Sequence, residues 1–100
     1  MKEIEWIVDA IDDELEDVEK YAKQALKYKD TDKLFSDTCM ELAKQELRHS
    51  EMLHAVVVSI IGRYRAEHGE PPADMKAVYD YIHKRYIDRV TRLKMLLVQT

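Results

Sequence analysis

A glutamate and a histidine stand three residues apart in the middle of the chain, at Glu46 and His49. On a helix this spacing places both side chains on one face, one turn apart. Carboxylate oxygens and a neutral imidazole nitrogen suit iron and manganese. Helical bundles hold these metals with such a Glu-x-x-His pair on one helix and a further glutamate on a facing helix. The candidate for that further glutamate is Glu14.

The position of Glu46 on a helical wheel predicts burial. With Glu46 as the origin and about 100° per residue, His49 lies about 60° away. Apolar residues lie within about 40° of Glu46 on one side and about 20° on the other; they are Phe35, Leu42, Leu53 and Ile60, and Cys39 and Val57. We therefore expect Glu46 at the middle of a buried stripe, with His49 facing the same interior. An isolated buried carboxylate costs several kcal/mol, so it needs a proton, a cation or a metal.

Each of these residues also has a structural interpretation. Glu46 and His49 could bond each other or Arg89, which lies on the apolar face of the third predicted helix. We favour a metal site for the pair. Glu14 falls at the edge of the first apolar stripe beside Tyr21, but it also belongs to an acidic run, and an exposed position is an equal alternative.

The chain has the composition of an all-α protein. It contains two glycines and two prolines, and strong helix formers are plentiful. Candidate breaks occur at residues 29–32 and 68–72, where helix-capping residues, a glycine and two prolines cluster. We predict one helical domain over residues 1–100, with an antiparallel hairpin over 3–68 (helices 3–28 and 33–68) and a third helix over 73–98.

Charge and hydropathy exclude several classes of function. The net charge is −4 and the basic residues form no block, so nucleic acid is not an expected partner. No apolar run approaches the roughly 18 residues of a membrane span. The acidic N-terminal segment does not resemble a signal peptide and Cys39 is the single cysteine, so we expect a cytoplasmic protein. A chain of 100 residues buries a small core, and we expect a homodimer or higher homo-oligomer.

Asp80 and His83 repeat the spacing of the first pair in the third predicted helix. Their phase differs, because Asp80 lies about 160° and His83 about 100° from the apolar residue Ile82. We expect both to flank the buried face, and we expect this helix to act as a lid on the hairpin or as a subunit contact. Structural positions are also assigned to three other side chains, namely His54, His68 and Cys39.

The first two predicted helices resemble one half of a ferritin-like di-iron bundle of the rubrerythrin and encapsulated-ferritin type. The resemblance rests on Glu14, Tyr21 seven residues later, the small residues that follow, and Glu46-x-x-His49 across a short turn. It covers residues 4–61. It implies that Glu14 and His49 are terminal metal ligands, that Glu46 bridges two metals, and that Tyr21 is a hydrogen-bonding neighbour of the site.

Because the chain carries one such half, the resemblance implies a four-helix bundle completed by dimerisation, with a di-iron or di-manganese site shared between two chains. The expected activity is ferroxidase-like: oxidation of Fe(II) by dioxygen or peroxide, with no catalytic residues apart from the metal ligands. The alternative is a non-catalytic interaction or assembly protein with the same fold, such as one of mobile-element origin, that uses its buried polar residues for register.

Overall fold

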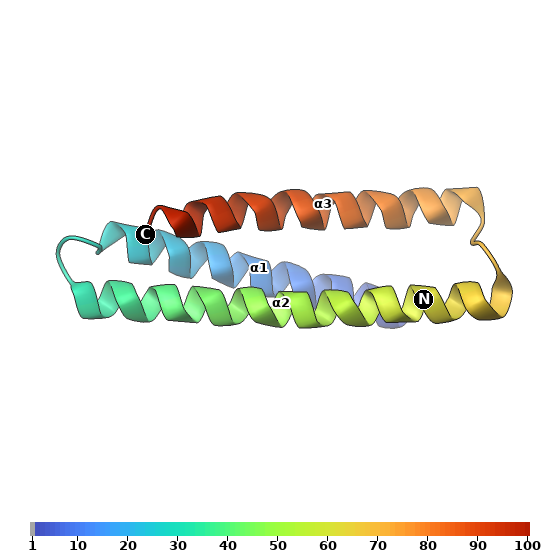
Figure 1. Cartoon of the computed structure of the whole chain (residues 1–100), viewed down its shortest axis with the longest axis horizontal. Helices are drawn as coiled ribbons and strands as arrows, with labels where there is room; N and C mark the ends of the chain where they lie inside the picture. Colours follow the sequence, from blue (N-terminus) through green and yellow to red (C-terminus); the bar gives the residue numbers. More distant parts are fainter. Residues whose placement is uncertain (1) are drawn as a thin grey trace.

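A computed structural model describes residues 2–100, and Met1, the first residue of the predicted domain, lies outside the described part. The chain forms three α-helices, α1 (Lys2–Lys27), α2 (Lys33–His68) and α3 (Ala73–Val98), with no strand between residues 2 and 100. The predicted all-α class and the three helices are therefore confirmed, with every helix boundary within one residue. The helices lie side by side in a rod of 56 × 17 × 16 Å (Figure 1).

Local signals in the sequence set the ends of α2. The Asp32 carboxylate accepts a hydrogen bond of 3.1 Å from the backbone N–H of Phe35, which caps the first turn. At the other end, Gly69 adopts a φ of 77°, which favours glycine, and its N–H donates to the Arg65 carbonyl at 2.9 Å. Both connections are short, so consecutive helices run antiparallel (Figure 1).

Small residues bring α1 and α2 close together. Ala22, Ala25 and Ala43 are fully buried, so the two backbones can approach closely. Near the turn, the buried Ser36 hydroxyl donates a hydrogen bond of 2.6 Å to the Ala25 carbonyl. This bond fixes how far one helix is shifted along the other.

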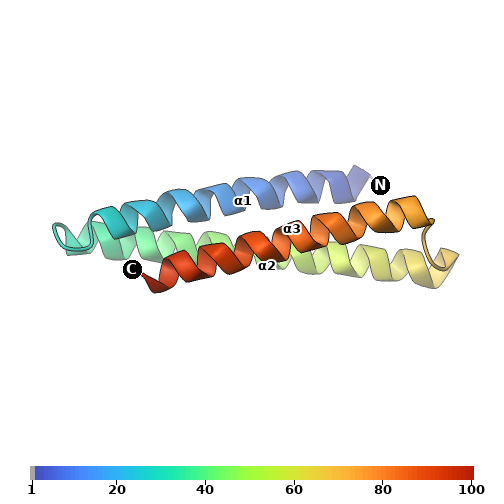
Figure 2. The same cartoon turned by 90° about the horizontal axis from the view of Figure 1, so that it is seen from above.

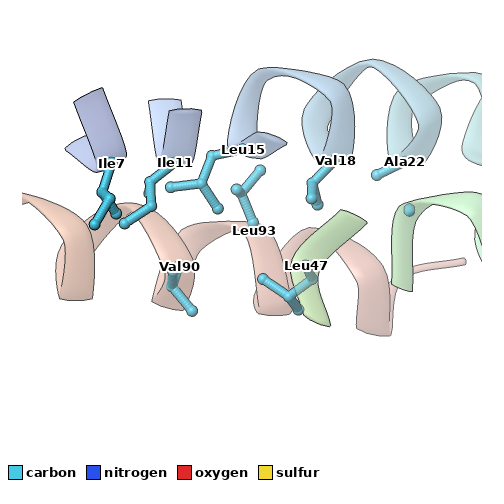
Figure 3. Close-up of a cluster of buried hydrophobic side chains, with 9 residues drawn as sticks. Ile7, Ile11, Leu15, Val18, Ala22, Leu47, Val90 and Leu93 are labelled. Carbon is cyan, nitrogen blue, oxygen red and sulfur yellow. The ribbon is translucent and has the colours of Figure 1, made fainter. Parts of the chain in front are cut away.

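The hydrophobic core draws on all three helices, but unequally. Most of its residues come from α1, and Leu47 of α2 packs among them (Figure 3). Only Val90 and Leu93 of α3 are buried. Figure 2 shows α3 crossing over α2, with α1 alongside. Full burial of one such side chain is worth about 1.5–3 kcal/mol. Three half-buried side chains of α3 also pack against the core, namely Tyr86, Leu96 and Leu97.

The buried stripe of α2 differs from the predicted one. The buried residues are Ser36, Cys39, Ala43, Leu47 and Ser50. Glu46 lies at the edge of this stripe rather than at its middle, and Phe35 is exposed. The cause is that α2 has two apolar sides, of which α1 and α3 cover one. A helical wheel does not distinguish the two apolar sides of α2, so it places the centre of the predicted buried stripe between them.

Polar contacts attach α3 to one side of the hairpin. Asp12 of α1 pairs with Arg89 at 3.2 Å and with Arg85 at 3.8 Å, and Glu51 of α2 pairs with Lys94 at 3.7 Å. Arg89 is therefore engaged by Asp12 and does not neutralise Glu46, which removes that structural alternative. The contacts of α3 lie on the sides of α1 and α2 that bear Asp12 and Glu51. Asp12 is about 160° around α1 from Glu14, and Glu51 about 140° around α2 from Glu46.

None of the helices over residues 2–100 has the combination of length and hydrophobicity that a bilayer span needs.

Candidate metal centre

The register of the hairpin brings Glu14 and Glu46 to the same level. Each lies about three helical turns from the Ser36–Ala25 hydrogen bond, Glu14 back along α1 and Glu46 forward along α2. His49 follows Glu46 by one turn on the same side of α2. The three predicted ligands therefore meet in the groove between α1 and α2, on the side away from α3.

Distances between the three side chains define a compact group. Nδ1 of His49 lies 3.6 Å from Oε2 of Glu14 and 3.8 Å from Oε2 of Glu46. One ligand atom from each residue lies within 4.8 Å of the others. Both separations exceed the usual hydrogen-bond range of about 2.7–3.2 Å. The imidazole therefore approaches both carboxylates without a hydrogen bond to either.

The group is partly shielded from solvent. The side chains of Glu14 and Glu46 are 27% and 22% exposed, and that of His49 is 52% exposed. Oε2 of Glu14 is itself buried and has no hydrogen-bond partner among the described residues. A buried polar atom without a partner is costly and rare in folded proteins, so this oxygen of Glu14 is the feature of the group that best fits a bound cation.

This donor set fits a transition-metal ion. An ion about 2.0–2.2 Å from each donor can join atoms up to about 4.2 Å apart, so both histidine–glutamate separations allow a shared ion. Two carboxylates and one imidazole match the requirements of Fe(II) and Mn(II). Among the described residues this is the one group of three or more histidine, cysteine or acidic side chains that could hold a metal.

The other residues considered from the sequence lie outside this group. Tyr21 is half-buried and packs against the hydrophobic core. No hydrogen bond in the described part of the chain joins its hydroxyl to the three ligands, and its role as a neighbour of the site stays a prediction. Cys39 is buried, as expected of a packing residue. His68 ends α2, and its ring lies 4.9 Å from that of Tyr64.

One contact between reactive side chains was not predicted. His54 of α2 and His83 of α3, both expected to be flanking residues, lie within hydrogen-bond distance of each other at 3.2 Å. A signal for this contact exists in the sequence. The two residues lie at nearly equal distances from Gly69, before and after it, so an antiparallel α2–α3 pair brings them level.

Comparison with protein families, curated proteins and solved structures finds no match to this chain.

Proposed function

We propose that this chain is a ferritin-like di-iron or di-manganese carboxylate protein that binds and oxidises Fe(II) at a site shared between two copies. The observation that carries the proposal is the convergence of Glu14, Glu46 and His49 with a buried, unpartnered oxygen on Glu14. Metal binding would compensate the cost of burying that oxygen.

A second copy of the chain is the proposed cover for the site. The uncovered side of α2 carries apolar residues on either side of the ligands, among them the exposed Phe35 and Val56 and the half-exposed Leu42. A two-fold axis would place the same face of each copy against the other. Each chain would then contribute Glu14, Glu46 and His49, which doubles the ligand set and completes a four-helix bundle from two hairpins.

Charge couples this association to metal binding. Two copies would bring four carboxylates into one interior, and their mutual repulsion and desolvation oppose a metal-free interface. Bound cations remove that penalty. By mass action, a metal that binds the dimer more tightly than the single chain strengthens dimerisation.

Each of the three residues has its own proposed role in metal binding. Glu14 and His49 would each bind one metal, and Glu46 would bridge two. The carboxylates supply the negative charge that favours Fe(III) over Fe(II), and bound iron supplies the redox chemistry, in which each Fe(II) gives one electron to dioxygen or peroxide. In the dimer, the apolar side chains around the ligands would limit access of bulk water to the site.

The test is an anaerobic Fe(II) titration of the metal-free chain, followed by exposure to air. We expect about one iron per chain, a larger molar mass with iron than without, and Fe(II) oxidation faster than in buffer. The His49→Ala variant should lose all three properties. Glu41→Ala, which changes an exposed acid on the same helix, is the matched control and should retain them.

A non-catalytic assembly protein with the same fold is the second candidate. It is favoured by large apolar side chains that the three helices leave in solvent, such as Leu34 and Met52, which are 78% and 65% exposed. An oligomer of unchanged mass with and without iron, and with no iron bound after the titration, would support this candidate and contradict the metal site.

A further inference from the structure

His54 and His83 form a contact between α2 and α3 that the proposed iron site does not use. Nε2 of His54 lies 3.2 Å from Nδ1 of His83. The His54 ring also stacks on Tyr86 of α3, with 4.3 Å between ring centroids and 10° between ring planes. His54 is half-buried and His83 is exposed, so the pair has one side in the protein and one side in water.

The spacing of the two nitrogens matches a coordination angle. If both nitrogens lie 2.0–2.1 Å from one ion, a separation of 3.2 Å corresponds to a nitrogen–metal–nitrogen angle of about 99–106°. The tetrahedral angle is about 109°. For such an angle each nitrogen lone pair points about 40° away from the line that joins the two atoms, and the broad χ2 torsion of histidine allows the rings to turn in this way.

The surroundings of the pair also suit a metal. Next to the pair is a cavity of about 80 Å³ with mostly apolar walls. Of the charged residues on its wall, Asp12 pairs with both Arg85 and Arg89. The protein atoms that can bind a metal here are therefore the two imidazole nitrogens, and solvent water can supply further ligands on the exposed side of His83.

We propose that His54 and His83 form a second metal site, separate from Glu14, Glu46 and His49, for a borderline divalent ion such as Zn²⁺. Imidazole nitrogen favours zinc, copper and nickel over ions that prefer carboxylate oxygen. Such an ion joins α3 to α2 directly. This link adds to other side-chain contacts between these helices, such as the His54–Tyr86 stack and the Lys94–Glu51 pair. The proposal does not depend on iron binding at the first site.

The test is a Zn²⁺ titration by calorimetry on the untagged, metal-free chain with Glu46→Ala and His49→Ala, which lacks the first site. We expect one Zn²⁺ per chain and a higher melting temperature with Zn²⁺. Adding His83→Ala should weaken binding by at least about tenfold, because the loss of a ligand costs no less than the loss of a residue that supports one. Adding His68→Ala, which removes an exposed histidine from the end of α2, should change nothing.

Two further measurements keep the result decisive. Circular dichroism of the metal-free variants establishes that each is folded, and His83 is suited to substitution because it is exposed. Co²⁺ in place of Zn²⁺ should give the intense visible absorption of tetrahedral coordination, and this absorption should disappear with His83→Ala. Zn²⁺ binding that is absent from the first variant, or that survives His83→Ala unchanged, would leave the two histidines as a simple hydrogen-bonded pair and overturn the proposal.

Discussion

Replacement of Glu46 by alanine separates a metal ligand from a structural polar residue. If Glu46 bridges two metals, Glu46→Ala should abolish iron binding and leave the stability of the metal-free protein nearly unchanged. If Glu46 and His49 are instead a structural pair, the same change should leave iron binding as it was and lower stability. The two hypotheses therefore predict opposite patterns in two independent measurements.

The structure sets the expected size of the stability change. Glu46 is 22% exposed and His49 is 52% exposed, and they lie 3.8 Å apart without a hydrogen bond. Such a solvent-accessible pair is worth about 0–1 kcal/mol. Alanine also gains a few tenths of a kcal/mol in helix propensity, and its introduction removes a carboxylate close to Glu14. We expect a net change within about 1 kcal/mol, or a melting-temperature shift below about 8 °C.

A structural pair at a buried position would behave differently. Loss of one partner from a buried pair costs about 3–5 kcal/mol, which corresponds to a fall of more than about 12 °C for a chain of this size. The assay combines anaerobic Fe(II) titration and metal analysis with thermal melting of the metal-free protein, for wild type, Glu46→Ala and His49→Ala. Glu46→Gln keeps the side-chain volume and removes the charge, so it distinguishes lost packing from lost ligation.

Glu41→Ala serves as the control for replacing an exposed acid on α2, and it should bind iron like wild type. Unchanged iron stoichiometry in both Glu46→Ala and His49→Ala, together with a sharp fall in their melting temperatures, would refute the metal assignment.

The remaining predictions concern association, α3 and pH. Light scattering should give a mass above the 11.8 kDa of one chain, because α2, with 36 residues, is longer than α1, with 26, and α1 cannot cover its full apolar length. A monomer at micromolar concentration with and without Fe(II) would contradict the shared site. Asp80→Ala with His83→Ala should leave iron stoichiometry intact and change stability by about 0.5 kcal/mol or less each, whereas loss of iron would move the site to α3. Burial and the nearby His83 lower the pKa of folded His54 from 6.5, so the unfolded chain binds this proton at higher pH. Stability of the metal-free protein should then fall as the pH drops below about 6.5 and through the lower folded pKa; melting temperatures that fall as steeply in His54→Gln would contradict this.

The helices and the contact of Glu14 with the Glu46–His49 pair could be predicted because both depend on local signals. Asp32 and Gly69 mark the ends of α2, and a short turn restricts how α1 and α2 align. Once two helices of a hairpin are aligned, the levels of their side chains follow from the rise per residue.

The burial of Glu46 and the partner of Arg89 could not be predicted in this way. Both depend on which side of the hairpin α3 occupies, and apolar residues are present on two sides of α2. Arg89 lies on an apolar stripe in the sequence, but the structure places it against Asp12 of α1, far along the chain. Such long-range pairings require the packing of the third helix, which the wheel of one helix does not contain.

The sparse attachment of α3 has a consequence for the order in which the chain comes apart. Regions with few buried apolar contacts open at lower free energy than the core, and they exchange their amide protons first. With Val90 and Leu93 as its only buried residues in the described chain, α3 should lift away while the α1–α2 hairpin, closed by its buried alanines, remains intact. The open form would expose the cavity wall and the far side of α2, whereas the groove that holds Glu14, Glu46 and His49 would keep its shape. The groove of Glu14, Glu46 and His49 and the most labile helix are therefore on opposite sides of the same hairpin, so opening of α3 need not disturb the groove.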